Sequence, residues 1–397
     1  MDDRKEQISE MEPLFIRDTA GQKPDLADLA LVLTEKSAAL RSSLPAEIAS
    51  ALANLVRSMN CYYSNLIEGH DTHPIDIERA LNGDFSNDPE QRNLQLEAKA
   101  HIKVQEWIDQ GGLAGRSTRC EGLLETHQRF CELLPEELLW IEDPKTKKRM
   151  KVIPGALRES HVSVGSHIGI SPGALPRFMK RFEEAYSNIG KLNFILSTAS
   201  AHHRFLWIHP FLEGNGRVAR LMSYAMLREI LSTGGIWSVA RGLARNEKQY
   251  KQLLSNCDSL CRNDFDGRGT LSEEALIEFT RFFLEICIDQ VDFVQGLMQP
   301  QRLRDRIMIW CEEEIRAGTL PTRSEKVLSI LILQGEIPRG DVAELLGTGE
   351  RSAQRVTKAL IERGIITSQS TRAPLHLSFP AALTSRWMPG LFPERTA

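Results

Sequence analysis

Residues 209–220 read HPFLEGNGRVAR and join two strongly apolar stretches, KLNFILSTASAHHRFLWI at 191–208 and RVARLMSYAMLREILS at 217–232. Apolar residues recur in both stretches at helical spacing, so we expect two helices connected by a short loop. The loop holds an imidazole, a carboxylate, an amide, two glycines and two guanidinium groups. That density of polar groups is unusual for a packing element, so the loop predicts a functional site within a helical fold.

Helical spacing of apolar residues continues on both sides of this loop, so the expected fold class is mainly α. Further helices are predicted at 45–60, 92–109, 121–134, 275–298 and 301–316. The exception is 154–172, PGALRESHVSVGSHIGISP, where Val162, Val164, Ile168 and Ile170 alternate with small or polar residues between glycine and proline. Such alternation predicts a short β-hairpin.

The pattern changes after residue 323, where three short helices precede a stretch of alternating polarity. The helices are expected at 324–333, 339–346 and 350–362, and the alternating stretch is ITSQSTRAPLHLSF. Three short helices followed by a small ribbon are typical of a winged helix-turn-helix domain. We therefore predict a winged-helix domain at 324–397.

Basic residues lie on the last of these helices, which would be the recognition helix. They are Arg351, Arg355, Lys358 and Arg363, and Arg372 in the ribbon adds another. Binding to phosphates needs several Lys or Arg side chains on one face. The domain is therefore expected either to bind DNA or to be a dimerisation or target-docking module that has the fold without this function.

Composition limits the class of protein. A chain of 397 residues is expected to form two or three domains, and its 42% apolar and 26% charged residues contain no uninterrupted apolar run long enough for a membrane span. The N-terminal residues MDDRKEQISEMEPL lack the basic start and apolar run of an export signal. Seven scattered cysteines indicate reduced thiols, and a net charge of −4 gives no general attraction to nucleic acid. We expect a cytoplasmic protein without membrane contact.

The loop at 209–220 has the properties of a polyphosphate site. Gly214 and Gly216 allow backbone N–H groups to approach an anion, and the next helix directs its positive dipole end at the same place. Arg217 and Arg220 are three residues apart, so both guanidinium groups can face one ligand. The simpler alternative is a tight turn between helices with solvated charges.

The remaining polar residues of the loop fit the chemistry of a phosphate ester. Glu213 offers the hard oxygen ligand that Mg²⁺ prefers beside bound phosphates. His209 titrates near neutral pH and could remove the proton of an attacking hydroxyl. In the alternative interpretation, His209 only caps the end of a helix.

The stretch resembles the signature of Fic proteins, HxFx[D/E]GNGRxxR. The signature is matched by His209, Phe211, Glu213, Gly214, Asn215, Gly216, Arg217 and Arg220. Residues 154–168 are also similar to the flap hairpin of this family, and 261–285 resemble the helices that follow its signature. The resemblance implies a Fic-type helical core, which we place at 119–300.

The resemblance also implies an activity, protein adenylylation. In the family, the histidine is the general base for a Ser, Thr or Tyr hydroxyl of a target protein, which attacks the α-phosphate of ATP and expels pyrophosphate. The corresponding roles here are His209 as base, Glu213 as Mg²⁺ ligand and Arg220 as contact of the γ-phosphate. Further contacts to the phosphates are implied for Gly214, Asn215, Gly216 and Arg217.

The segment Ser64-Asn65-Leu66-Ile67-Glu68-Gly69 is similar to the inhibitory motif [S/T]xxxE[G/N] of one class of Fic proteins. The resemblance implies that Glu68 pairs with Arg220 and prevents ATP from binding productively, with Ser64 as the first residue of the motif. Relief of the inhibition would allow the chain to modify itself. The alternative is a helix end, since glutamate followed by glycine is common there.

Two further sets of ATP-site residues follow from the resemblance. The flap would be lined by Val162, Ser163, Val164 and Gly165, and its exposed edge could pair with an extended segment of the target. An ordinary surface hairpin is the alternative. Tyr250 stands where the family often has an aromatic residue near the adenine, although Cys257 replaces the Asn that some relatives have seven residues later.

Two patterns that suggest a metal site are interpreted without one. The stretch 264–275 resembles a calcium loop, but Arg268 and Ala275 replace required ligands. His202 and His203 lie on a predicted helix without a second cluster at matching spacing.

The predicted organisation is an N-terminal helical region at 1–118, the Fic core at 119–300, a linker helix at 301–323 and the winged helix at 324–397. The expected function is an autoinhibited, Mg²⁺-dependent protein adenylyltransferase. Two alternatives stay open: a DNA-binding regulator whose core senses nucleotide, and a Fic enzyme that removes AMP or transfers another phosphate-containing group. The sequence also leaves a homodimer open.

Overall fold

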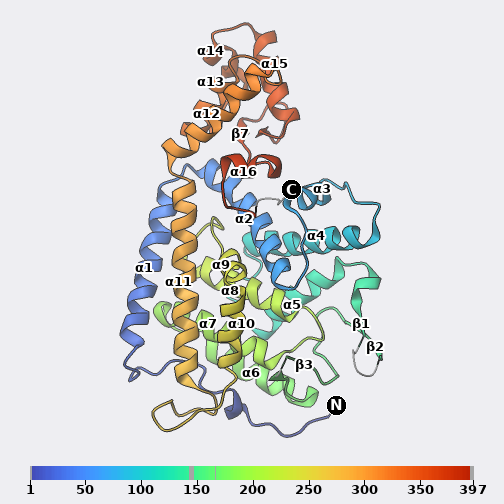
Figure 1. The fold of residues 1–397 in the computed structure, drawn as a ribbon, viewed down its shortest axis with the longest axis vertical. Helices are drawn as coiled ribbons and strands as arrows, with labels where there is room; N and C mark the ends of the chain where they lie inside the picture. Colours follow the sequence, from blue (N-terminus) through green and yellow to red (C-terminus); the bar gives the residue numbers. More distant parts are fainter. Residues whose placement is uncertain (1, 143–146, 166, 394–397) are drawn as a thin grey trace. The chain divides into compact units, whose positions relative to one another are not determined.

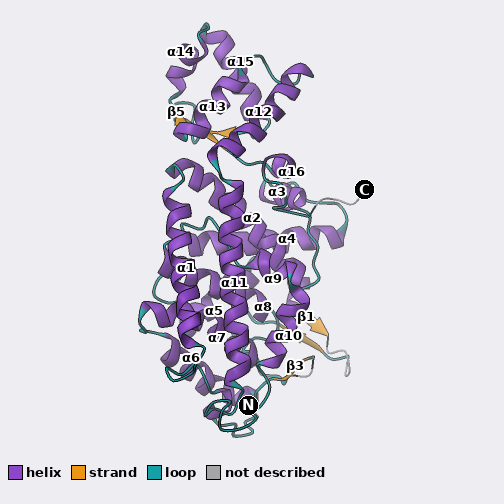
Figure 2. Cartoon of the chain, turned by 60° about the vertical axis from the view of Figure 1, so that its left-hand side comes forward, coloured by secondary structure: helices purple, strands orange, loops and turns teal. Residues whose placement is uncertain are grey.

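The computed structural model describes residues 2–142, 147–165 and 167–393, and within these ranges the chain is mainly helical with seven short strands (Figures 1 and 2). The predicted fold class is thus confirmed. The chain divides into two compact units. Unit 1 comprises Met1–Ser37, Asn60–Thr233 and Ser238–Gln290, and unit 2 comprises Ala38–Met59, Gly234–Trp237 and Val291–Ala397.

Most α-helices precede residue 298. They are α1 (Lys23–Ser42), α2 (Ala46–Ile67), α3 (Pro74–Leu81), α4 (Pro89–Asp109), α5 (Cys120–Glu132), α6 (Leu175–Tyr186), α7 (Lys191–Ile208), α8 (Asn215–Leu231), α9 (Ala240–Arg245), α10 (Glu247–Asn256) and α11 (Glu273–Leu297). Short 3-10 helices form at η1 (Ile8–Met11), η2 (Glu136–Leu139) and η3 (Pro172–Ala174). Local sequence explains several starts; for example, Asp88 accepts a hydrogen bond from the Gln91 N–H at 2.9 Å, and Pro89 takes the first position of α4.

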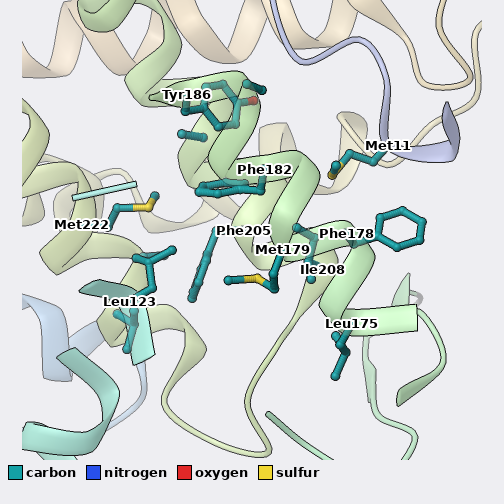
Figure 3. Packing of buried hydrophobic residues seen from close by; sticks show 14 of the residues in the cluster. Met11, Leu123, Leu175, Phe178, Met179, Phe182, Tyr186, Phe205, Ile208 and Met222 are labelled. Carbon is teal, nitrogen blue, oxygen red and sulfur yellow. The ribbon is translucent and has the colours of Figure 1, made fainter. Parts of the chain in front are cut away.

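The core of unit 1 gathers around α6, α7 and α8. Figure 3 shows large apolar side chains from α6 and α7, including Phe178, Phe182, Phe205 and Ile208, with Met222 of α8 beside them. These five side chains are essentially inaccessible to solvent. Because His209 directly follows Ile208, this packing fixes the end of α7 from which the catalytic candidate projects.

The N-terminal segment before α1 is also part of unit 1, which the sequence did not indicate. The Tyr186 hydroxyl donates to the Leu14 carbonyl at 3.0 Å, and Arg204 donates to the Pro13 carbonyl at 3.0 Å. The amide of Leu271 donates to the Glu12 carbonyl at 2.8 Å. These backbone contacts tie the segment to α6, α7 and the loop before α11.

Two small antiparallel hairpins accompany the helices of unit 1. The predicted hairpin is present, but its ladder is confined to β3 (Ser163–Val164) and β4 (His167–Ile168), and Ser166 lies outside the described residues. A second hairpin of β1 (Trp140–Glu142) and β2 (Arg149–Lys151) was not predicted. Each of its strands has three residues, too few for alternation to be read from sequence.

Unit 2 contains the compact C-terminal elements. After α12 (Pro300–Arg316) they are α13 (Ser324–Gln334), β5 (Glu336–Ile337), η4 (Arg339–Asp341), α14 (Val342–Leu346), α15 (Glu350–Glu362), β6 (Ile366–Thr367), β7 (Leu375–Leu377), η5 (Ala381–Leu383) and α16 (Thr384–Trp387). The strands form one antiparallel sheet in the order β5-β7-β6. Three helices and a small sheet are what the sequence predicts for 324–397, of which 394–397 lie outside the described residues.

The helices α1, α2 and α11 each contribute residues to both compact units, so no single cut in the sequence separates these units. The domain boundaries at 118, 300 and 323 stay a prediction. Among the described residues, no helix is long and apolar enough to cross a membrane. None of the seven cysteines forms a disulfide bond.

Candidate active site

His209 ends α7 and has an unusual backbone conformation. Its φ of 52° and ψ of 61° lie in the left-handed region, and its N–H donates to the Phe205 carbonyl at 3.0 Å. A non-glycine residue rarely adopts this conformation outside a structurally constrained position. The turn directs the chain from α7 into the 209–214 loop.

The His209 side chain has a defined tautomer. Its Nδ1 lies 3.2 Å from the Leu206 carbonyl, and because a carbonyl oxygen only accepts, Nδ1 carries the proton. Nε2 therefore has a lone pair, and no described residue bonds to it. Burial lowers the pKa of His209 to about 4, with a smaller contribution from Arg158. At neutral pH the imidazole is thus in the form that accepts a proton.

The loop after His209 is held from inside the unit. Phe211 is fully buried, its N–H donates to the Asn215 side-chain oxygen at 2.9 Å, and the Asn215 amide donates to the Phe211 carbonyl at 2.8 Å. Asn215, expected from the resemblance to contact phosphates, thus uses its side chain to close the loop. The backbone N–H of Asn215, at the start of α8, is the group that is left to contact a phosphate.

His127 of α5 contacts the same loop through its ring and through a hydrogen bond. Its ring stacks on Phe211 with the ring centroids 3.8 Å apart and the planes nearly parallel. Its Nδ1 accepts from the Gly155 N–H at 3.0 Å, so Nε2 carries the proton and donates to the Glu213 carbonyl at 3.2 Å. His127 therefore fixes the backbone at the residue expected to hold Mg²⁺.

The start of α8 can receive an anion. Gly214 precedes the helix with a φ of 84°, and no side chain caps the first turn. The N–H groups of Asn215, Gly216 and Arg217 have no acceptor within the helix, because the first intrahelical bond is made by Val218 to the Gly214 carbonyl. Unpaired N–H groups and the helix dipole attract negative charge to this point.

Arg217 is buried and faces two acidic residues. Its guanidinium forms an ion pair with Glu97 of α4, lies 3.7 Å from Glu213 and stacks over the Phe130 ring at 5.3 Å. Glu97 is itself buried and accepts from His70 Nδ1 at 2.8 Å, a hydrogen bond that raises the pKa of His70. Glu97 and His70 hold Arg217 from outside the signature.

Arg220 is held by the segment that resembles the inhibitory motif. Its Nε donates to the Ser64 hydroxyl at 2.8 Å, its Nη2 donates to the Ser64 carbonyl at 3.1 Å, and Nη2 also pairs with Glu68. Burial alone would raise the pKa of Glu68, but Arg220 and Arg217 outweigh it and hold the pKa below its ordinary value. Glu68 is therefore a carboxylate at neutral pH.

Glu68 also lies against the first turn of α8. A methyl group added at Gly216 would collide with Glu68 Oε1, so only glycine leaves room for the carboxylate there. The Glu68 carboxylate consequently occupies the place to which the N–H groups and dipole of α8 would draw an anion. The inhibitory role of Ser64 and Glu68 remains a prediction that this geometry supports.

A cavity of about 390 Å³ opens beside the loop. Its polar side is formed by Glu68, Glu97, Glu213 and Arg217, among others, and its apolar side includes Phe130 of α5 and residues of the β1–β2 region. The loop is therefore open to ligands on this face while its other face is packed into the core.

The flap hairpin is exposed where a partner would pair with it. Ser163, Val164 and Gly165 are exposed, whereas Val162 is half-buried and its carbonyl accepts from the Gly169 N–H at 3.1 Å. The opposite strand is anchored, since His167 Nε2 donates to the Trp207 carbonyl of α7 at 2.8 Å. The four predicted flap residues are thus accessible next to α7, but no described contact links them to a nucleotide site.

Tyr250 does not line an open nucleotide site. Its side chain is almost completely buried, and its hydroxyl lies 2.7 Å from His202 Nε2, while His202 Nδ1 lies 2.9 Å from the Ser223 hydroxyl. Tyr250 is a core residue that joins α10 to α7 and α8, and its contact with adenine stays a prediction. His202 and its neighbour His203, predicted only to lie on a helix, are buried core residues too. The described residues contain no cluster of three metal-ligating side chains.

Four residues that hold the site were missed by sequence reasoning. They are His70, Glu97, His127 and Arg158. A weak signal existed for two of them, because Glu97 and His127 fall among buried positions of amphipathic helices, where a charged or polar side chain needs a partner. Their partners are 27 or more residues distant and leave no trace in local sequence.

Comparison with known proteins agrees with this geometry. Residues 121–227 match the model of the Fic/DOC family. Protein adenylyltransferase Fic of Drosophila erecta is 40% identical over 75 residues, and that of Drosophila melanogaster is 40% identical over 78 residues. Each match covers 18% of this chain and only 15% of the relative.

A solved structure extends the similarity in fold. The crystal structure of a Fic family protein from Desulfovibrio desulfuricans G20 superposes with a TM-score of 0.52 at 17% identity, over 89% of this chain and 96% of that one. At this identity the likeness concerns the fold alone. Together with the intact signature at 209–220, the match of residues 121–227 shows that this chain contains a Fic/DOC family domain.

Proposed function

We propose that the chain is a protein adenylyltransferase that transfers AMP from ATP to a Ser, Thr or Tyr hydroxyl of a target protein. The main support is one arrangement: His209, neutral and with Nε2 available, ends α7 just before an uncapped helix start that carries two buried arginines. The curated relatives that match part of this chain are named protein adenylyltransferases. The chain itself is one of the candidate targets.

In the proposed reaction, the hydroxyl proton moves to His209 Nε2 as the hydroxyl oxygen attacks the α-phosphorus of ATP. A new phosphorus–oxygen bond to the target forms, and the bond between the α-phosphorus and the bridging oxygen breaks. Pyrophosphate leaves with the electron pair. The N–H groups at the start of α8 and the guanidinium groups of Arg217 and Arg220 would bind and orient the phosphates, so catalysis is mainly positioning and charge stabilisation.

The residues at the loop fit a magnesium ion that is held together with substrate. Glu213 has a side chain that is 53% exposed, and the described residues offer no cluster of three metal-ligating groups. Mg²⁺ is commonly bound through one or two carboxylates plus substrate phosphates, and it keeps several waters. Glu213 would hold the ion, whose charge would offset that of the phosphates.

Glu68 would make this enzyme autoinhibited, because its carboxylate pairs with Arg220 and lies over the first turn of α8. The target would dock along the flap, where Val164 is 54% exposed and its strand has a free edge. Docking through backbone groups would leave the identity of the target weakly specified by this surface.

ATP labelled at the α- or γ-phosphate distinguishes the possible reactions. With Mg²⁺, the α-label is expected on protein, the γ-label is expected in free pyrophosphate, and one pyrophosphate is expected per AMP transferred. Because inhibition by Glu68 would lower the rate of transfer, both the wild type and Glu68→Gly are assayed. Transfer of the γ-label, or no label from either ATP in both chains, would contradict the proposal.

We further propose that unit 2 binds DNA through α15. Arg351 and Arg355 are exposed, and no described carboxylate lies within ion-pair distance of either. Lys358 is instead paired with Glu362 at 3.6 Å, and another basic residue of this helix end, Arg363, with Glu314 at 2.7 Å. Two unpaired arginines support weak, salt-sensitive binding to phosphates.

A gel shift of the full chain with duplex DNA at low salt tests this second function. Replacing Arg351 and Arg355 together with alanine is expected to weaken the shift at low salt, and to lower the slope of log affinity against log salt by about 2. Arg316→Ala, which removes an exposed arginine of α12 paired with Glu312, is the control and should leave binding unchanged. Wild type that fails to bind at low salt would exclude DNA binding.

A further inference from the structure

Arg158 lies between β2 and β3 and is almost completely buried. Its guanidinium donates only to backbone carbonyls: Nε to His209 at 2.7 Å, Nη1 to Ser160 at 2.8 Å, and Nη2 to Ile170 at 2.7 Å and to Ile208 at 3.4 Å. Its own N–H donates to the Pro210 carbonyl at 2.9 Å. One side chain thus binds two parts of the chain that are far apart in sequence.

The first of these parts is the base of the flap. Ser160 precedes β3 and Ile170 follows β4, so Arg158 bridges the two ends of the hairpin. The pairing is completed by the Gly169 N–H, which donates to the Val162 carbonyl. Arg158 therefore sets where the flap leaves the body of unit 1.

The second part is the turn that carries His209. The last carbonyls of a helix have no partner within the helix, and Arg158 binds those of Ile208 and His209. His209 is in a left-handed conformation, and its carbonyl accepts from this external donor. Arg158 thereby fixes the backbone from which the imidazole projects.

Burial of an arginine without a carboxylate partner costs free energy of folding. The burial of Arg158 therefore differs from ordinary core packing. Among the described residues no carboxylate lies within ion-pair distance of Arg158, and burial lowers its pKa to about 10. The surroundings are also fitted to it, because a methyl group added at Gly169 would lie 2.9 Å from Arg158 Nη2 and 3.0 Å from a Val162 methyl.

We propose that Arg158 is a positioning residue that sets the flap and His209 in one geometry, so that a hydroxyl docked on the flap meets the base. This inference rests on the proposed adenylyltransferase function. Arg158 touches neither the reacting atoms nor the first turn of α8. Its loss should therefore lower the rate of transfer and leave the affinity for ATP nearly unchanged.

The test compares Arg158→Ala, Arg158→Lys and Gly169→Ala in full-length chains that carry Glu68→Gly. Arg158→Ala is expected to lower kcat about 100-fold with KM for ATP within about threefold, since small misplacements of reacting groups cost this much. Lysine retains the charge but lacks the planar fork, so Arg158→Lys should fold and still lose about tenfold in kcat. Gly169→Ala should displace the guanidinium and lower kcat similarly.

Hydrogen exchange supplies a readout that is independent of activity. In wild type and in each variant, peptides that cover residues 160–170 are expected to exchange faster once Arg158 is lost or displaced, whereas a purely local defect at His209 would not alter them. Arg177→Ala is the matched control, because Arg177 also donates to a backbone carbonyl, that of Glu6 at 2.8 Å, but contacts neither the flap nor the loop.

The outcomes distinguish a failure of the proposed adenylyltransferase function from a failure of the positioning role of Arg158. A parent chain with no AMP transfer would contradict the proposed function, and the exchange measurement would still test Arg158. The positioning role would be overturned if Arg158→Lys had the kcat of the parent chain. It would also be overturned if the variants raised KM for ATP instead of lowering kcat, or if hydrogen exchange of the flap did not change. If Arg158→Ala fails to fold, the positioning role is tested with Arg158→Lys and Gly169→Ala alone.

Discussion

Glu68→Gly is expected to increase the incorporation of AMP about 10- to 100-fold. The Glu68 carboxylate pairs with Arg220 and lies where an anion would meet the first turn of α8. A charge-assisted hydrogen bond to a buried group is worth about 1.5–3 kcal/mol, and each 1.4 kcal/mol corresponds to a factor of ten in the population of the competent state. The rate of label transfer from α-labelled ATP is the measurement.

Glu68→Gln separates the charge of this side chain from its shape. The amide retains the volume but loses the ion pair with Arg220, so an increase smaller than that of Glu68→Gly is expected. Glu90→Gln removes one exposed carboxylate of α4 and serves as the control, with no expected effect. If Glu68→Gly incorporates label at the wild-type rate while His209 is intact, Glu68 is not a brake.

His209→Ala is expected to lower kcat by about 10²–10⁴-fold, the usual contribution of a general base. The affinity for ATP should change little, because the groups suited to phosphates belong to α8 and not to the imidazole. Single-turnover rates and equilibrium binding of ATP, both in the Glu68→Gly background, measure the two effects separately. His376→Ala, in unit 2, is the control histidine.

The pH dependence of the rate tests the same assignment. An ordinary histidine loses its basic form as the pH falls through about 6.5. Burial lowers the pKa of His209 to about 4, and because the deprotonated form is the active one, its loss is displaced to lower pH. We expect a rate that is level between pH 6 and pH 8 and falls only toward pH 4. An acid limb centred near pH 6.5, or full activity of His209→Ala, would contradict the role of His209 as base.

The sequence was most informative where chemistry and local structure coincide. The helix at 191–208 was predicted with its observed bounds. The candidate site at 209–220 could be recognised because its polar residue types lie within twelve consecutive positions. The hairpin was located but drawn too long, since alternation continues through Ile170 although the ladder ends at Ile168. Ser64 and Glu68 were found because their spacing matches a known motif, and the end of α2 indeed brings both to Arg220.

The rest depends on tertiary contacts that local patterns do not encode. The resemblance places Tyr250 near the adenine, but local sequence does not say that the side chain is buried, because an aromatic residue is compatible with both surface and core. Glu97 looked like one more polar residue of an amphipathic helix until its neighbour Arg217 was known. The division into two compact units is not visible in local sequence, because three helices contribute residues to both.

The two carboxylates that hold the signature arginines both come from outside the matched family region. Glu97 pairs with Arg217 and Glu68 with Arg220, whereas the Fic/DOC match begins at residue 121. A shortened gene that encodes only 121–227 would therefore separate Arg220 from Glu68 and Arg217 from Glu97, and would leave Arg217 with Glu213 alone. Breaking a buried ion pair in this way costs about 3–5 kcal/mol, comparable with the whole stability of a small domain. Such a fragment could lose activity through misfolding even as it loses its brake, so expression clones should begin well before Ser64.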